Sequence, residues 1–256
     1  MFPGFRTVAR MPSLDGLGPA LLVGLLAVVM LWFAFGTQRN IRRGNEILRW
    51  LQGGLPQLGS RTTLRWLGSS AVELGVTEAA APFRDATVVV VLEPRDVGLL
   101  WAFGRARGRR DFVIVRANLR RAPRFGLQVF DPHGWTAFRE PPGDGWEQID
   151  GADGILAYAT AGADVGPARE AWARLREQSD GVWRLSIQPV VPQLEVHIRP
   201  PAPGRVPAAR LVETVRRLGA RLAGHAQADR PAGPGGAGAH HRRGDAHPAD
   251  PPGGAG

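Results

Sequence analysis

The 256-residue chain contains no cysteine. Disulfide scaffolds, cysteine-ligated zinc sites and thiol nucleophiles are therefore excluded, because each requires a cysteine sulfur. Lysine is absent as well, since all 32 basic residues are arginine, and this excludes a glycine-rich phosphate loop that ends in lysine. The arginine excess is typical of a GC-rich genome, although arginine also binds phosphate and carboxylate more specifically than lysine. We find no cofactor motif and expect no cofactor.

Residues 16–38 carry no charge, and most of residues 21–35 are Leu, Val, Ala, Phe or Trp. A helix of this length crosses the roughly 30 Å hydrocarbon core of a bilayer. We therefore predict a transmembrane helix over 16–38, preceded by a short flank over 1–15. A cleaved signal peptide is the competing interpretation, because Ala34-Phe35-Gly36 resembles a cleavage site. The long apolar core and the arginines that follow it favour the membrane anchor.

The arginines around this segment predict its orientation. The flank holds Arg6 and Arg10, whereas a heavier cluster follows the apolar run at Arg39, Arg42, Arg43 and Arg49. Positive charge close to a helix end resists translocation, so the heavier cluster is expected to stay inside the cell. We predict a single-pass protein of the cell membrane with its N-terminus outside and its C-terminal domain in the cytoplasm.

A juxtamembrane segment over 39–58 follows, with Ile41, Ile47, Leu48 and Leu51 near helical spacing. Its apolar stripe either packs on the folded domain or lies on the lipid headgroups, with Trp50 at the interface. Gly53, Gly54 and Pro56 are expected to end the helix.

The soluble part, residues 59–224, is predicted to be an α+β domain with a mixed sheet. Strands are expected at 62–67, 71–77, 86–92, 111–115, 125–130, 154–160, 182–188 and 194–198, and helices at 95–107, 167–178 and 205–223. The helix over 95–107 is expected to turn Val97, Leu100, Trp101 and Phe103 inward and to join two parallel strands by a right-handed crossover. Similar element order predicts two duplicated β-α-β-β units at 86–131 and 154–199.

The C-terminal helix is amphipathic and is expected to dock on the sheet, with Leu211 and Leu218 on its apolar face. Residues 225–256 are rich in Gly, Pro, Ala and His, contain no periodic apolar set, and are expected to be disordered.

The sequence contains few candidates for catalysis. Asp131 and His133 form an acid–imidazole pair in an expected turn, but no nucleophile accompanies them. His197 alternates with apolar neighbours and is expected on the solvent side of its strand. The histidines near the C-terminus have no fixed scaffold, so we expect no metal site.

Charge is unevenly placed, because residues 39–134 contain 16 arginines and 8 acids whereas residues 135–228 are balanced. Basic residues near a membrane attract anionic headgroups. An ordinary solvated arginine surface is the alternative explanation. The predicted membrane or phosphate contacts are Arg39, Arg42, Arg43, Arg105, Arg107, Arg109, Arg110, Arg120 and Arg121.

These observations favour a membrane-anchored cytoplasmic interaction or scaffold module, rather than an enzyme, with its basic half on anionic lipid and a protein partner that the sequence does not identify. One alternative is a membrane-tethered nucleic-acid-binding protein that uses the same arginines. The other is a membrane-bound enzyme acting on a lipid-borne or acidic substrate near Asp131 and His133.

Overall fold

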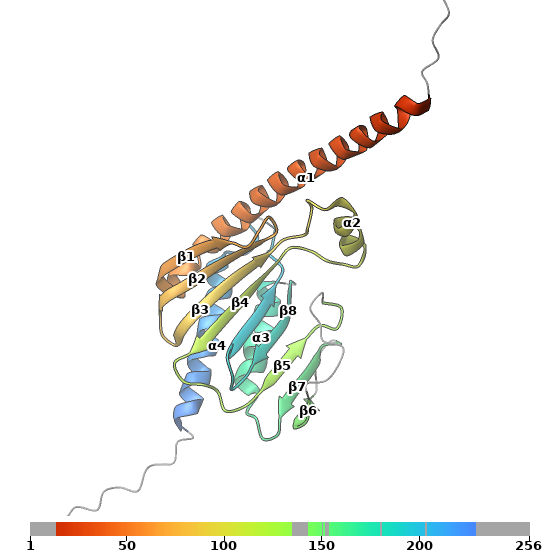
Figure 1. Ribbon diagram of the computed structural model, residues 1–256. Coiled ribbons are helices and arrows are strands. Elements are labelled where there is room, and N and C mark those ends of the chain that lie inside the picture. The colour runs from red at the N-terminus through yellow and green to blue at the C-terminus, as the bar shows by residue number, and fades with distance from the viewer. Residues whose placement is uncertain are drawn as a thin grey trace, which may run out of the picture.

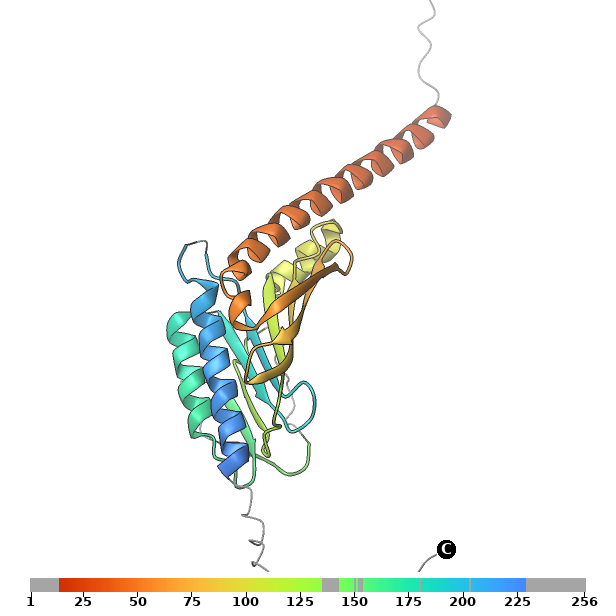
Figure 2. The same cartoon turned by 90° about the vertical axis from the view of Figure 1, so that its left-hand side faces the viewer.

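The computed structural model describes residues 14–134, 143–149, 151, 154–179, 181–202 and 204–228. A long N-terminal helix leads into an antiparallel sheet that carries two helices on one face (Figure 1, Figure 2). The helices are α1 (Leu14–Gln52), the short 3-10 helix η1 (Leu55–Gln57), α2 (Gly98–Ala106), α3 (Gly166–Gln178) and α4 (Ala208–Ala228). The strands are β1 (Gly59–Trp66), β2 (Ala71–Ala79), β3 (Phe83–Val91), β4 (Phe112–Leu119), β5 (Leu127–Phe130), β6 (Trp146–Ile149), β7 (Leu156–Thr160), β8 (Val182–Ile187) and β9 (Leu194–Ile198).

The described strands form one sheet in the order β1-β2-β3-β4-β9-β8-β5-β7-β6. Every neighbouring pair is antiparallel. The α+β class is therefore confirmed, whereas the predicted mixed pairing is wrong. The strand predictions agree with eight observed strands to within a few residues, but no strand was predicted where β6 lies.

Helices α3 and α4 lie side by side on one face of the sheet (Figure 2). The core between the layers contains Leu175 of α3, Leu211 and Leu218 of α4, and Leu185 and Val196 of the sheet, all at most 2% exposed. The predicted docking of the C-terminal helix is therefore confirmed. The helix continues to Ala228, past the predicted boundary at residue 224, and the rest of the predicted tail lies outside the described residues, as does most of the N-terminal flank.

The predicted parallel crossover between β3 and β4 is wrong, because Val91 pairs with Phe112 and the strands run antiparallel. A nine-residue helix spans about 13 Å, whereas a nine-residue strand spans about 30 Å. Helix α2 is therefore too short to return the chain to the start of β3. Residues 92–111 instead leave the end of β3 and come back to the same end of the sheet, so that α2 projects from it toward α1 (Figure 1).

The second predicted unit is connected differently. Strands β7 and β8 both run antiparallel to β5, which lies between them, so they are parallel to each other. Helix α3 joins them, and its 13 residues span about 20 Å, close to the length of β7. The two units thus share an element order but not a strand pairing, and the internal duplication stays a prediction.

Candidate functional site at the base of the apolar helix

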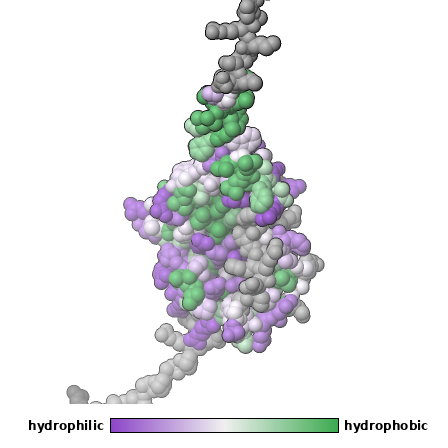
Figure 3. All heavy atoms as spheres, turned by 45° about the vertical axis from the view of Figure 1, so that its right-hand side comes forward, coloured by the Kyte–Doolittle hydropathy of each residue, from purple (hydrophilic) through white to green (hydrophobic). Residues whose placement is uncertain are grey.

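Helix α1 is the one helix among the described residues that is long and apolar enough to cross a membrane. Its large apolar side chains from Leu17 to Phe35 are exposed, for example Leu21 at 72% and Phe35 at 73%. Figure 3 shows this apolar surface extending from a domain whose visible face carries both hydrophilic and hydrophobic patches. The same helix continues without a break to Gln52, where Ile47, Leu48 and Leu51 are buried in the core.

The juxtamembrane part of α1 packs on the folded domain. Ile47, Leu48 and Leu51 contact the core, and the Trp50 Nε1–H donates a hydrogen bond of 2.8 Å to the Val206 carbonyl. Of the two predicted alternatives, packing on the folded domain or lying on the lipid headgroups, the structure shows packing on the domain. Ile41 is the exception, because it is 36% exposed. The helix ends before Gly53, as predicted.

Helix α2 and its preceding loop are fixed against α1 at the level of Trp32. The Trp32 Nε1–H donates a 3.0 Å hydrogen bond to the Arg95 carbonyl, and the Trp32 and Trp101 ring centroids are 6.4 Å apart. Two glycines permit this approach. A side chain at Gly36 would overlap the backbone of Arg95, and one at Gly98 would overlap the Trp32 ring.

The apolar face of α2 is exposed, contrary to the predicted inward packing. Leu99 is 90% exposed, and Val97, Leu100 and Phe103 are each about half exposed. Trp101 is less exposed than these residues, and its Nε1–H donates to Glu93 at 2.7 Å. The reason is the chain path described above, since α2 extends beyond the end of the sheet and has no sheet surface to pack on.

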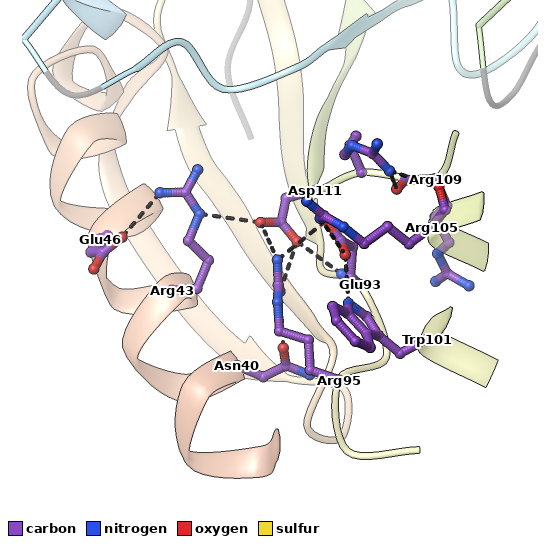
Figure 4. A network of polar contacts seen from close by, with 10 residues as sticks. Asn40, Arg43, Glu46, Glu93, Arg95, Trp101, Arg105, Arg109 and Asp111 are labelled. Atoms are coloured by element: carbon purple, nitrogen blue, oxygen red, sulfur yellow. Dashed lines mark hydrogen bonds and ion pairs between the residues drawn. The ribbon is translucent and has the colours of Figure 1, made fainter. Parts of the chain in front are cut away.

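Below α2, buried carboxylates and guanidinium groups form a network that joins α1, the β3–α2 loop and the start of β4 (Figure 4). Asp111 accepts two hydrogen bonds of 3.0 Å from Arg95 and one of 3.1 Å from Arg43. Glu93, with a side chain 3% exposed, pairs with Arg95 at 3.4 Å and with Arg105 at 3.3 Å. Burial alone would raise the pKa of Asp111, but the hydrogen bonds from Arg95, the Glu93 N–H and Arg43 lower it overall.

A cleft of about 710 Å³ opens beside this network. Its lining consists of Arg39, Arg42, Arg43, Glu46, Glu93, Arg95, Arg110, Asp111, Arg199 and Pro200. The six arginines outnumber the three carboxylates, and those carboxylates already pair with Arg43, Arg95 and Arg105. Within the described chain, no carboxylate pairs with Arg39, Arg42 or Arg199. The cleft is therefore electropositive and suited to an anion.

The structure brings only some of the predicted contact residues together. Arg39, Arg42, Arg43 and Arg110 line the cleft. Arg110 also donates to the carbonyl oxygens of residues 105 and 109.

Other predicted contacts lie beside the cleft or far from it. The Arg107 guanidinium stacks 4.0 Å from the Phe103 ring centroid, next to half-buried Arg109. Arg120 is at the opposite end of β4, where it donates to the Phe83 and Ala79 carbonyls, and Arg121 follows it. The predicted contact residues are therefore divided between two ends of the sheet.

The sequence interpretation missed the buried members of the site, namely Glu93, Arg95 and Asp111, together with Trp32 as the contact for α2. A signal was present, because Glu93 and Asp111 flank two predicted apolar strands whose ends coincide only in an antiparallel pair. The expected crossover placed them at opposite ends of the sheet and concealed the pairing.

His197 is buried, which corrects its predicted solvent exposure. Its side chain lies on the sheet face opposite α3 and α4, packed against Phe112 and Trp183. Its Nε2 is 2.7 Å from Glu195, which also accepts a 2.7 Å hydrogen bond from Arg116. Burial lowers the pKa of His197. Burial opposes ionisation of Glu195, but its partners His197 and Arg116 outweigh that effect and lower the pKa of Glu195 to about 2.

This pair is expected to destabilise the fold in acid. The folded state disfavours protonated His197, so stability falls as the pH drops through 6.5 and below. The lowered pKa of Glu195 adds stability above pH 4.5 that is lost as the pH falls toward 2. We expect Glu195→Gln to lower the free energy of unfolding at neutral pH by about 1–3 kcal/mol and to flatten the loss below pH 4.5. Urea unfolding of the full chain in detergent, followed by tryptophan fluorescence, measures the free energy of unfolding at neutral pH and in acid. If the variant loses as much stability below pH 4.5 as the unchanged protein, Glu195 does not cause that loss.

The other sequence candidates for chemistry do not form a site. Asp131 contacts His133 at 3.3 Å, but the His133 side chain is 92% exposed in a surface turn. No group of three or more potential metal-binding side chains occurs among the described residues. In comparisons with known proteins, the chain matched no family model and no curated protein.

Proposed function

We propose that this protein is a single-pass membrane protein whose α+β domain lies in the cytoplasm against the bilayer and acts as a non-enzymatic interaction or scaffold module. One observation carries the proposal. The exposed apolar surface of α1 ends at Phe35, and Arg39 and Arg42 follow within two turns at the rim of a basic cleft. This is the order of side chains that a helix presents as it leaves hydrocarbon and enters the anionic headgroup layer.

The contacts of Trp32 and Gly36 favour an anchor over a cleaved signal peptide. Cleavage after Gly36 would remove Trp32, which hydrogen bonds to the loop before α2 and whose ring centroid lies 6.4 Å from that of Trp101. A signal peptide has no reason to make specific contacts with the mature domain. The buried continuation of α1 also fixes the domain close to the membrane, because the tether contains no flexible linker.

The two alternative functions have less support. Nucleic-acid binding through all the predicted contact arginines requires that they lie on one basic patch, but Arg120 lies at the far end of the sheet from Arg110. Catalysis requires a placed acid, base or nucleophile in a cleft. Asp131 and His133 lie in an exposed turn, and the Glu195–His197 pair is buried.

We expect a reporter fused to the C-terminus to be active only in the cytoplasm, with the full-length chain retained in carbonate-washed membranes. Replacing Arg39, Arg42 and Arg49 by Ser is expected to give a mixed orientation, because the cytoplasmic positive charge is removed. Arg43 is kept, since it pairs with Asp111 and its loss would also perturb the fold. The matched control replaces the exposed arginines Arg61, Arg84 and Arg174 by Ser and should leave the orientation unchanged. A released, shortened and exported product would contradict the proposal.

A further inference from the structure

An apolar groove separates α1 from α2. It has a volume of about 520 Å³ and is lined on the α1 side by Val28, Leu31, Trp32 and Phe35, and on the α2 side by Trp101. On the other side of Trp32, a second apolar groove of about 540 Å³ lies between Val29 and Leu99. Both grooves open outward along the apolar surface of α1, and their walls are almost entirely hydrocarbon.

The exposed apolar face of α2 lies beside the same stretch of α1 as these grooves. Leu99, Leu100 and Phe103 would be costly to expose to water, since burial of apolar area is the main favourable term in protein association. Trp32 lies inside the apolar run of α1 and holds α2 at its own level. When α1 spans a bilayer, α2 therefore enters the domain-facing leaflet, and lipid covers its apolar face and fills the grooves.

The apolar groove continues into the basic cleft, because Arg39 and Arg95 line both. Arg39 and Arg42 are three residues apart, so their side chains share one face of α1. Neither has a carboxylate partner among the described residues. The apolar groove, which is large enough for an acyl chain, thus adjoins the positive charge of Arg39, which has no carboxylate partner in the described part of the chain. Arg39 lies about 10 Å along α1 from Trp32.

We propose that this continuous space binds one anionic phospholipid of the domain-facing leaflet. Its acyl chains lie in the groove between α1 and α2, and its phosphate and acidic headgroup lie against Arg39 and Arg42 in the cleft. This proposal rests on the membrane anchoring proposed above. It goes further because it assigns a specific ligand class and residues to the α1–α2 junction. The apolar groove favours a lipid over free phosphate, which has no group to place there.

The test uses the full-length protein in detergent with native mass spectrometry, offered phosphatidylglycerol or phosphatidylcholine in equal amounts. We expect one phosphatidylglycerol to remain bound preferentially. Arg39→Gln with Arg42→Gln should lower its affinity about 30-fold, if each arginine contributes as near-surface basic residues do. The control pair Arg61→Gln with Arg84→Gln removes the same charge at the opposite end of the sheet and should change nothing. An equal loss of phosphatidylglycerol affinity in the control pair, or equal retention of the two lipids, would overturn the proposed site.

A second variant separates a lipid from a free phosphate. Val28→Trp fills the groove without changing charge and is expected to reduce phosphatidylglycerol retention, whereas Leu22→Trp, outside the groove, is not. Glycerol 3-phosphate should not displace the lipid at millimolar concentration. Displacement, or indifference to Val28→Trp, would show that the cleft binds a soluble anion and would overturn the proposal. Membrane retention of the same variants is measured in parallel, so that a failed lipid site is distinguished from a failed anchor.

Discussion

Leu218→Asp is expected to unfold the domain. Leu218 lies on the buried face of α4, is 1% exposed and contacts the core beneath the sheet. The substitution removes a buried leucine, which costs about 2–5 kcal/mol, and leaves a carboxylate without a partner, which costs several kcal/mol more. The sum approaches the whole stability of an ordinary domain, about 5–15 kcal/mol.

The control for this substitution is Ala220→Asp, two residues further along α4 at an exposed position. It introduces the same charge into the same helix without burial, so its effect is expected to stay within about 0.5 kcal/mol. Limited proteolysis of the full chain in detergent distinguishes the two variants. Equal protease resistance of both would mean that α4 does not contribute to the core.

The helix predictions succeeded where one face of a helix is buried for its whole length. In α4 the apolar positions Leu211, Val215 and Leu218 repeat with helical spacing, and each contacts the core. The strand predictions succeeded for a similar reason, since an apolar run such as residues 86–92 is buried as a strand in the interior of the sheet. Local pattern is sufficient when the surrounding fold supplies the surface that the pattern requires.

The pairing of β3 with β4 could not be predicted in this way. An apolar strand, a helix and another apolar strand are compatible with a parallel crossover or with an antiparallel excursion, and the length of α2 decides between them. The predicted helix of 95–107 was four residues longer than the observed one, Gly98–Ala106. The parallel crossover was inferred from the element order alone, and it placed the apolar side chains of α2 on the sheet, whereas they are exposed.

The candidate site was predicted in part. Net charge located the arginines near residues 39–43 and 105–110, because an excess of basic residues is visible in a sequence. Two of the ion pairs were not visible, because Asp111 is 68 residues from Arg43 and Glu93 is 12 residues from Arg105 along the chain. As a result, Arg43 and Arg105 looked equivalent to Arg39 and Arg42, although the first two are held in ion pairs. Arg121 is exposed at the far end of the sheet and does not line the cleft.

Asp111→Ala is expected to lower the free energy of unfolding by about 3–5 kcal/mol, the usual cost of breaking a buried ion pair from one side. Asp111 is the shared acceptor for Arg95 and Arg43, and it also accepts a 2.8 Å hydrogen bond from the Glu93 N–H. Its removal leaves the Arg95 guanidinium, 12% exposed, with Glu93 as its remaining carboxylate partner. The control Glu73→Gln breaks an exposed pair with Arg65 and should cost less than about 1 kcal/mol.

Asp111→Asn separates the structural role of this carboxylate from its effect on ligand binding. The amide keeps the side-chain shape but removes the negative charge, so stability should fall less than in the alanine variant. The cleft then gains positive charge, because the charge on Arg43 and Arg95 is no longer balanced by Asp111. We therefore expect lower stability in urea together with tighter retention of phosphatidylglycerol. Lower stability with tighter lipid retention would mean that Asp111 both stabilises the fold and reduces the positive charge of the cleft. A residue with a structural role alone would lower both the stability and the lipid retention.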